Sequence, residues 1–327
     1  MKVLVTGATA GFGAAIVRRF AADGHRIVAM GRRNNRLEAL ANEFGLACIH
    51  PVVLDVRDRT AVEAAIGGLP PDFAELDLLV NNAGLAAGLD PAQNADLDAW
   101  DAMVDTNVKG LMYVTRAVLP GMVARNRGLI INLGSTAATY PYPGGNVYGA
   151  TKAFVRQFSL NLRADLLGTK VRITDVEPGL VGGTEFSTVR FRGDRAKAAK
   201  LFEGADALTP EDIAETIHWI ATLPPRVNVN AIEHAGDAGF RASLSSIARI
   251  DPLRSWSVAS GPFDEVECLR PRAGSTLKPS DWLQLAAKRQ FDRTPVTGVR
   301  KRRFLPGGQR PGARGLGLIA NAGAIGT

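Results

Sequence analysis

Cysteine is scarce in this chain, with only Cys48 and Cys268 among 327 residues. Two cysteines are too few for a disulfide framework, and their spacing does not suit a metal site. We therefore expect a protein of the reducing cytoplasm. Histidine is also rare, and the four residues share no ligand spacing, so we expect surface or packing roles for them and no bound metal. They are His25, His50, His218 and His234.

Long apolar runs are missing too, because no stretch approaches the roughly 18 residues that a membrane span needs. The start of the chain is one short apolar segment followed by glycines, which is not the pattern of a secretory signal. Charge is unevenly divided: residues 1–233 carry 24 basic and 25 acidic side chains, whereas residues 234–327 carry 15 and 7. The near-neutral first part predicts a small-molecule protein. The second part holds a basic cluster, residues 299–303, without interleaved aromatics or a recognisable module. Such a cluster supports only nonspecific attraction, so nucleic acid is not an expected partner.

A glycine-rich turn near the N-terminus predicts a dinucleotide site. Residues 2–5 form a β-rich apolar run, residues 6–13 supply the turn, and residues 14–22 are amphipathic, which indicates strand, turn and helix. Glycines let the backbone bend sharply and approach a pyrophosphate, while free N–H groups at the helix start bind the anion. The spacing is Gly-x-x-x-Gly-x-Gly, and a plain left-handed turn is the alternative. The expected cofactor contacts are Gly7, Ala8, Thr9, Ala10, Gly11, Phe12 and Gly13.

An acidic residue is absent after the second expected strand, residues 26–30. Many dinucleotide folds place an acid there to hold the ribose hydroxyls, but this chain has Gly31-Arg32-Arg33. Two arginines can bind a 2′-phosphate that an acid would repel, so the sequence predicts NADP(H) and not NAD(H). The alternative is that Arg32 and Arg33 are solvated residues ahead of a helix over residues 36–44.

Strands and helices continue to alternate. Further strands are expected over residues 49–54, 76–80, 129–133, 171–176 and 227–232, and helices over residues 60–66, 97–108, 110–125, 148–167 and 207–221. This order predicts an α/β, doubly wound Rossmann fold with a mostly parallel sheet of about seven strands and ligands at their carboxyl ends. Asp55-Val56 and Asn81-Asn82 follow two such strands. Asp55 could bind an adenine amino group or cap the next helix, and Asn82 is expected beside the cofactor.

Tyr148 and Lys152 lie four residues apart, so they share one face of an expected helix. An ammonium beside a phenol favours the phenolate and would lower its pKa from about 10, which suits proton exchange at neutral pH. Ser135, at the end of a strand, could hold the substrate oxygen. Such a pair also occurs by chance, so the assignment depends on the glycine loop and Ser135 lying at the same sheet edge.

The motifs Thr-Gly-x-x-x-Gly-x-Gly, Asn-Asn-Ala-Gly, Ser, Tyr-x-x-x-Lys and Pro-Gly occur in this order, and residues 1–233 resemble a short-chain dehydrogenase/reductase. More narrowly, residues 144–155 and 177–186 resemble the NADP-dependent 3-hydroxy acid dehydrogenases. The resemblance implies hydride transfer between NADP(H) and serine, allo-threonine or 3-hydroxypropionate, with reduction of malonic semialdehyde. Two alternatives stay open. One is a short-chain reductase of a ketone, sugar or 3-oxoacyl group, and the other is a non-catalytic NADP-sensing regulator.

The resemblance also implies roles for single residues. Tyr148 is the acid and base, Ser135 positions the substrate oxygen, Lys152 holds the nicotinamide ribose and lowers the pKa of Tyr148, and Asn107 anchors a proton-relay water. Further cofactor contacts are implied for Pro178, Gly179, Val181 and Thr184. The polar residues 180–205 are expected to form a lid, from which we hypothesise that Arg190 holds the substrate carboxylate. A solvated Arg190 is the alternative.

The chain departs from the family after Glu233. Relatives end shortly after the last strand with a segment like Met-Pro-Val-x-Gln-x-Phe and are commonly homotetramers. Here residues 234–241 differ and residues 242–327 follow. One permitted back-translation of residues 234–241, shifted by one base, encodes Met-Pro-Val-Thr-Gln-Ala-Phe. We therefore hypothesise a Rossmann domain over residues 1–233 and a basic, low-order extension over residues 234–327 that arose by a frameshift. A genuine accessory tail is the alternative, and the altered ending leaves the assembly open.

Overall fold

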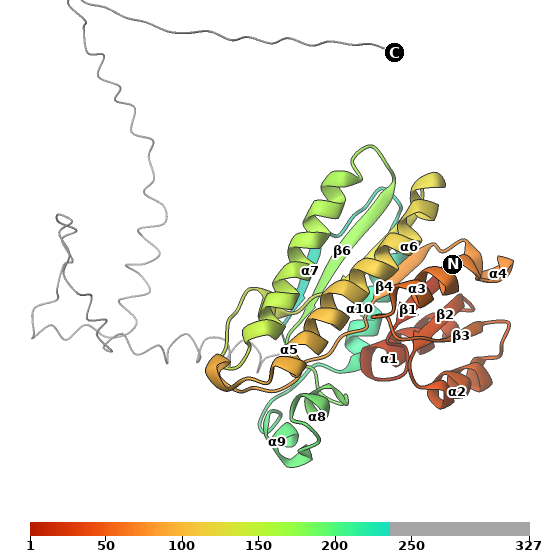
Figure 1. Cartoon of the computed structure of the whole chain (residues 1–327). Helices are drawn as coiled ribbons and strands as arrows, with labels where there is room; N and C mark the ends of the chain where they lie inside the picture. The colour runs from red at the N-terminus through yellow and green to blue at the C-terminus, as the bar shows by residue number, and fades with distance from the viewer. Residues whose placement is uncertain (236–327) are drawn as a thin grey trace, which may run out of the picture. The chain divides into compact units, whose positions relative to one another are not determined.

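The computed structural model describes residues 1–235 (Figure 1). Their centre is a seven-stranded sheet in which every neighbouring pair of strands is parallel, with the order β3-β2-β1-β4-β5-β6-β7. The strands are β1 Lys2–Thr6, β2 Arg26–Gly31, β3 Ile49–Val53, β4 Leu78–Asn81, β5 Gly128–Leu133, β6 Val171–Pro178 and β7 Ala231–His234. The predicted doubly wound α/β fold is therefore confirmed.

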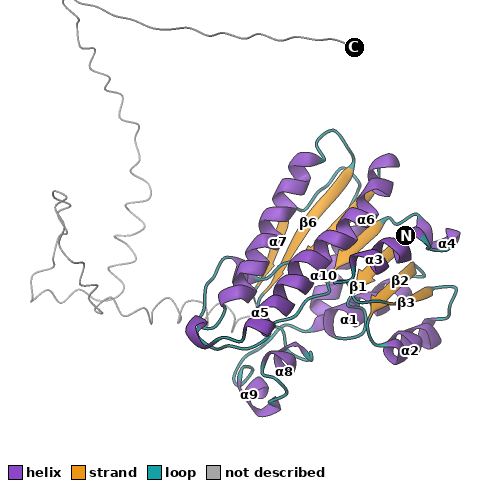
Figure 2. Ribbon diagram, in the orientation of Figure 1, coloured by secondary structure: helices purple, strands orange, loops and turns teal. Residues whose placement is uncertain are grey.

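Helices connect the strands and cover the sheet (Figure 2). The main helices are α1 Gly11–Ala22, α2 Asn34–Phe44, α3 Arg59–Gly67, α5 Leu97–Val104, α6 Leu111–Ala124, α7 Asn146–Asp165 and α10 Pro210–Thr222. The shorter helices are α4 Pro71–Ala74, α8 Phe186–Arg190 and α9 Arg195–Lys200, with the single turns η1 Ala92–Asn94, η2 Asp105–Gly110 and η3 Thr136–Ala138. Among the described residues, none of the helices is long and apolar enough to cross a membrane.

Two hydrophobic clusters, one on each side of the sheet, account for the layered packing. Side chains alternate between the faces of a strand, so Val3 and Val5 of β1 pack with α1, α2 and α10, whereas Leu4 packs with α3, α6 and α7. All three side chains are fully buried. A strand that is buried on both faces has a continuous apolar sequence, and this explains why residues 3–5 are uniformly hydrophobic.

The strand order reverses between β1 and β4. From β1 the chain builds outward through β2 to β3, and it then returns to β4 on the other side of β1. The loops after β1 and β4 therefore lie at the carboxyl ends of the strands at the point of reversal, which is where ligands bind in open α/β sheets. The glycine turn follows β1 and Asn82 follows β4, so both lie at this switch point.

The structure differs from the expected elements in three places. A π-helical turn, η2, separates α5 from α6, and the expected lid contains α8 and α9. The last strand is Ala231–His234 rather than residues 227–232. Residues 227 and 228 contact β6 through side-chain hydrogen bonds and not through strand pairing. The amide of Asn228 donates to the carbonyl of Ile173, and the guanidinium of Arg172 donates to the carbonyl of Val227. The last strand thus runs one residue beyond the predicted domain boundary, and most of the predicted extension, residues 236–327, lies outside the described part of the chain.

Candidate active site

The turn after β1 is tightly packed and exposes backbone N–H groups, a geometry that suits the binding of an anion. Gly7 and Gly11 adopt φ angles of +67° and +49°, which side-chain-bearing residues rarely adopt. A Cβ atom on Gly13 would lie 2.2 Å from the carbonyl oxygen of Gly7, so a larger residue would break the packing of α1 against the turn. Ala10, at the N-cap of α1, provides no side-chain hydrogen bond. The first N–H groups of this helix therefore remain available to an anion.

Asn82 links this turn to the end of β4. Its side-chain nitrogen donates hydrogen bonds to the carbonyl oxygens of Thr6 at 2.8 Å and Gly7 at 3.2 Å. In return, the hydroxyl of Thr6 accepts from the backbone nitrogens of Asn82 and Ala83 at 3.0 and 2.9 Å. These bonds fix the backbone on both sides of the switch point, so Asn82 lies where it was expected, next to the glycine turn.

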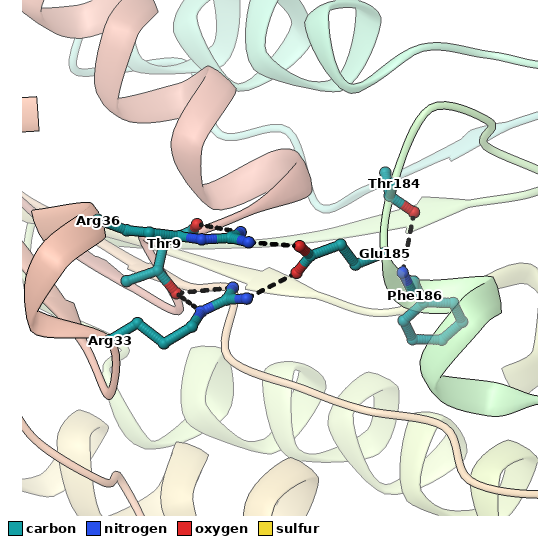
Figure 3. Close-up of polar contacts among 6 residues, drawn as sticks. All are labelled: Thr9, Arg33, Arg36, Thr184, Glu185 and Phe186. Carbon is teal, nitrogen blue, oxygen red and sulfur yellow. Dashed lines mark hydrogen bonds and ion pairs between the residues drawn. The ribbon is translucent and has the colours of Figure 1, made fainter. Parts of the chain in front are cut away.

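Two arginines lie beside the same turn (Figure 3). They are Arg33 and Arg36, whereas the sequence had predicted Arg32 and Arg33. Arg33 donates from Nε and Nη2 to the hydroxyl of Thr9 at 3.2 and 3.0 Å, and Arg36 donates from Nη1 to the carbonyl of Thr9 at 3.2 Å. Arg32 points elsewhere, with two-thirds of its side chain exposed and a carboxylate oxygen of Asp55 3.9 Å away. Sequence reasoning overlooked Arg36, although its spacing of three residues from Arg33 places both on one side of a helix start.

Asp55 is engaged by a neighbouring arginine and does not cap the next helix. Its carboxylate accepts from Nε and Nη2 of Arg57 at 3.0 and 2.6 Å, and this bonding holds the pKa of Asp55 below its usual range. Asp58 caps α3 instead, through a 3.0 Å hydrogen bond from the backbone nitrogen of Ala61. The neighbouring Val56 is buried against Gly110, where a Cβ atom would lie 2.6 Å from a methyl group of Val56.

The expected catalytic residues Ser135, Tyr148 and Lys152 come together at the carboxyl end of β5. Tyr148 and Lys152 lie on α7 and are each 8% exposed, which places both groups in a largely dry environment. Nζ of Lys152 lies 5.8 Å from the centre of the Tyr148 ring and donates to the carbonyl oxygen of Leu133 at 2.6 Å. The hydroxyl of Ser135 caps η3 by accepting from the backbone nitrogen of Ala137 at 3.1 Å.

The pKa of Tyr148 moves in the direction opposite to the sequence expectation. Burial raises the pKa of Tyr148 to about 12, and the nearby Ser135 hydroxyl only partly opposes this effect. Burial also lowers the pKa of Lys152 to about 8, against the attraction of Asp175. The expectation failed because it counted the charge of Lys152 and not the loss of water around the phenol, which disfavours the phenolate.

Asn107 lies within the π-helical turn η2 and is 2% exposed. Its side chain accepts from the backbone nitrogen of Leu85 and donates to the carbonyl of Leu85, both at 2.9 Å, and it donates to the hydroxyl of Thr151 at 3.1 Å. Thr151 directly precedes Lys152 on α7. Asn107 therefore ties the loop after β4 to the catalytic helix, and π-helical turns are often found at such functional positions.

Arg190, at the end of α8, lies inside the site rather than in solvent. Its guanidinium carbon is 5.6 Å from the centre of the Tyr148 ring and 4.9 Å from that of Tyr142, whose hydroxyl accepts a hydrogen bond from Nη2. Nε of Arg190 is buried and has no hydrogen-bond partner among residues 1–235. The lid thus supplies a positive charge next to the phenol of Tyr148.

The remaining expected cofactor residues lie along the chain after β6. Gly179 donates from its backbone nitrogen to the carbonyl of His234 at 2.8 Å, directly after Pro178. Val181 forms an isolated parallel bridge with Leu208. A Cβ atom on Gly11 would lie 3.3 Å from the methyl group of Thr184, so this segment reaches the glycine turn. The structure thus places the segment after β6 next to the glycine turn after β1, and both segments hold residues that are expected to contact the cofactor.

A pair of buried acids behind the site was not anticipated. Asp175 and Glu177, on β6, are 2% and 3% exposed. Burial and the neighbouring Glu177 side chain raise the pKa of Asp175 to about 7. A Cβ atom on Gly134 would lie 2.5 Å from Oδ1 of Asp175, so the glycine before Ser135 makes room for this carboxyl group.

Two histidines that are far apart in the sequence meet near the start of β2. Potential ligand atoms of Asp23, His25 and His218 lie within 4.8 Å of one another, which sequence spacing had not indicated. However, Arg19 contacts Asp23 at 3.0 Å and Nδ1 of His218 at 3.1 Å. The guanidinium charge supplies the positive charge that a metal ion would bring, so this group of residues works as an ion-pair cluster.

Known proteins resemble most of this chain. The short chain dehydrogenase family matches residues 1–194. The NADP-dependent 3-hydroxy acid dehydrogenase YdfG of Salmonella typhi is 63% identical over 233 residues, covering 71% of this chain and 94% of that protein. Serine 3-dehydrogenase of Rhizobium radiobacter is 50% identical over 248 residues, covering 75% and 98%. Among solved structures, the closed form of serine dehydrogenase complexed with NADP⁺ has a TM-score of 0.71 and 60% identity, covering 72% of this chain and 94% of that one. The chain therefore belongs to the short chain dehydrogenase family.

Proposed function

We propose that this protein is an NADP(H)-dependent oxidoreductase of small 3-hydroxy acids. The observation that carries the proposal is the position of Arg190, whose guanidinium lies 5.6 Å from the ring of Tyr148. A substrate whose hydroxyl oxygen contacts Tyr148 can then place a carboxylate, a few bonds away, against Arg190. The names of the relatives, a 3-hydroxy acid dehydrogenase and a serine dehydrogenase, support the same class of substrate.

The residues present fit NADP(H). Gly7 and Gly13 leave space that a Cβ atom would fill, and the start of α1 offers free N–H groups to a pyrophosphate. Arg33 and Arg36 together bind an acidic oxygen pair beside Thr9, which is the chemistry that a 2′-phosphate requires. We assign the phosphate contact to Arg33 and Arg36, while Arg32 and Asp55 lie nearer the expected adenine side.

NADP(H), when bound, supplies or accepts the hydride. Tyr148 donates a proton to the substrate oxygen in reduction and removes one in oxidation, while Ser135 hydrogen-bonds the same oxygen. The Lys152 ammonium, which donates to the carbonyl of Leu133 and lies 5.8 Å from the centre of the Tyr148 ring, would hold the nicotinamide ribose and favour the phenolate. Asn107 fixes the neighbouring turn of α7 and anchors the proton-relay water.

The proposed substrates are serine, allo-threonine, 3-hydroxypropionate and, in reduction, malonic semialdehyde. The test is a substrate panel that follows NADPH absorbance with these acids and with neutral alcohols of equal length. We expect kcat/KM for the acids to exceed that for the alcohols by about tenfold or more, the value of one charge-assisted contact. Activity on the neutral alcohols alone would contradict the acid assignment and would favour a ketone or 3-oxoacyl reductase.

A non-catalytic NADP-sensing regulator is the second candidate. Such a protein needs the cofactor residues but not Tyr148, Lys152, Ser135 and Asn107 in one site, and all four are present here. The expected homotetramer and cytoplasmic location remain predictions. Light scattering on the purified full chain, together with fractionation of the native host, would test them.

A further inference from the structure

The carboxylate of Glu185 occupies the space between the two arginines that we assign to the 2′-phosphate (Figure 3). Glu185 follows Thr184 on the segment after β6, and it reaches across to α2. Its Oε2 accepts from Nη1 of Arg33 at 2.7 Å, and its Oε1 accepts from Nη2 of Arg36 at 2.6 Å. Each carboxylate oxygen thus contacts a different arginine, and in each case through a guanidinium nitrogen that does not bond Thr9.

This arrangement reproduces what a phosphate would do. Two carboxylate oxygens present the same kind of acceptor pair to guanidinium groups as two phosphate oxygens. The bonds to Arg36 and Arg33 lower the pKa of Glu185, so its carboxylate is ionised at neutral pH. A second anion at this position would find the donors of Arg33 and Arg36 already bonded, and the carboxylate of Glu185 would repel it. Carboxylate and 2′-phosphate therefore compete for one site.

We propose that Glu185 acts as an internal competitor of the 2′-phosphate and tethers the lid segment, residues 186–200, to α2 until a phosphorylated cofactor displaces it. The inference rests on the proposed NADP(H) function. It adds a residue that sets the strength of phosphate recognition. It also adds a link between the cofactor's phosphate and the lid that carries Arg190.

The side chains are roughly half exposed, which limits how strongly the tether holds. Arg33, Arg36 and Glu185 are 40%, 42% and 47% exposed, and ion pairs of such exposure are individually weak. A phosphate carrying close to two negative charges can therefore displace one carboxylate. Without the Glu185 carboxylate, the affinity for the 2′-phosphate should rise about three- to tenfold. This factor corresponds to the free energy of two weak, half-exposed ion pairs.

The experiment measures binding of cofactor fragments to the purified full chain by calorimetry. The two ligands are 2′,5′-ADP, which carries the 2′-phosphate, and 5′-AMP, which lacks it. The variant is Glu185→Gln, and the matched control is Glu43→Gln, which removes another half-exposed pair, with Arg18, on the same helix α2. We expect Glu185→Gln to bind 2′,5′-ADP about three- to tenfold more tightly than wild type, with 5′-AMP affinity unchanged and the control unchanged for both ligands.

Hydrogen exchange of residues 186–200 supplies a second readout that does not require turnover. Exchange should be faster in Glu185→Gln than in wild type or Glu43→Gln. In the wild type, 2′,5′-ADP should accelerate it and 5′-AMP should not. If the wild type prefers 2′,5′-ADP but Glu185→Gln shows equal or weaker affinity for it, the competitor role is wrong and the NADP(H) function stands. If neither the wild type nor Glu185→Gln binds 2′,5′-ADP more tightly than 5′-AMP, both the competitor role and the NADP(H) function are wrong.

Discussion

Lys152 donates a hydrogen bond of 2.6 Å from Nζ to the carbonyl oxygen of Leu133, the last residue of β5. This bond fixes the ammonium at the carboxyl end of the sheet, 5.8 Å from the centre of the Tyr148 ring. Burial lowers the pKa of Lys152 to about 8, so the group still carries its charge at neutral pH. A positive charge held by the backbone next to a buried phenol is the feature on which the proposed proton transfer depends.

Replacing Lys152 with Met should lower kcat/KM by about a hundredfold or more, because the phenol loses the nearby charge that favours its ionised form. Lys109→Met is a suitable control, since Lys109 forms an exposed pair with Asp105 on η2. Steady-state kinetics with NADPH and the best acid of the panel would measure both variants. Equal activities of the two variants would exclude the role given to Lys152.

Tyr148→Phe should reduce kcat by about 10² to 10⁴, the usual contribution of a positioned acid or base. The ring is buried and its hydroxyl is the only atom removed, so the fold should persist. The variant should still bind 2′,5′-ADP with wild-type affinity in a calorimetric titration. Tyr140→Phe, at an exposed tyrosine eight residues earlier, serves as the control. Retention of kcat in Tyr148→Phe would require another proton donor.

Arg190→Met should raise KM for serine about tenfold or more and leave KM for a neutral alcohol within about twofold, because only the acid loses a charged partner. Arg192→Met is the control, since Arg192 pairs with Asp96 at 3.2 Å on the surface. Equal changes for the acid and the alcohol would show that Arg190 shapes the site without binding the carboxylate.

The three arginines near the turn should differ in their effect on cofactor choice. Arg33→Met and Arg36→Met should each lower kcat/KM for NADPH about tenfold or more and leave that for NADH nearly unchanged, because each removes donors from the phosphate position. Arg32→Met should have the smaller effect, since Arg32 faces Asp55 and is mostly exposed. A dominant effect of Arg32 would return the phosphate contact to the residue pair expected from the sequence.

The buried acid pair predicts a stability change with pH. Asp175 has a folded-state pKa of about 7, whereas an unfolded aspartate titrates near 4. Its stabilising contribution is thus complete below about pH 4 and is lost as the pH rises through about 7. Asp175→Asn should remove this loss, so the melting temperature should fall by several degrees less than in wild type between pH 5 and 7.5. Asp165→Asn, at an exposed acid, should behave like the wild type.

The sequence predicted the sheet well because strands that are buried on both faces are short apolar runs, as in residues 3–5, which a glycine turn follows. It predicted that Ser135, Tyr148 and Lys152 lie at one sheet edge, because the motifs follow the carboxyl ends of strands. Asn107 came only from the family resemblance, and the catalytic roles of all four residues stay predictions. The sequence did not predict the features that depend on side-chain orientation and on contacts between distant segments. The orientation of Arg32 away from Arg36, the meeting of His25 with His218, and the loss of water around Tyr148 all follow from packing between distant segments. Neither the meeting of the two histidines nor the loss of water around Tyr148 has a signature in residue spacing, whereas the spacing of Arg33 and Arg36 was a signal that went unused.

The hydrogen bond from Gly179 to His234 joins main-chain atoms only. Pro178 and Gly179 border the expected cofactor site, so β7 supports that border through its backbone. The side chain of His234 makes a separate contact of 2.9 Å, from Nε2 to the hydroxyl of Thr216 on α10. The main-chain bond to Gly179 does not depend on which side chain stands at position 234. The backbone support of the expected cofactor site is therefore independent of the side chain at the position where we hypothesise that this chain departs from its relatives.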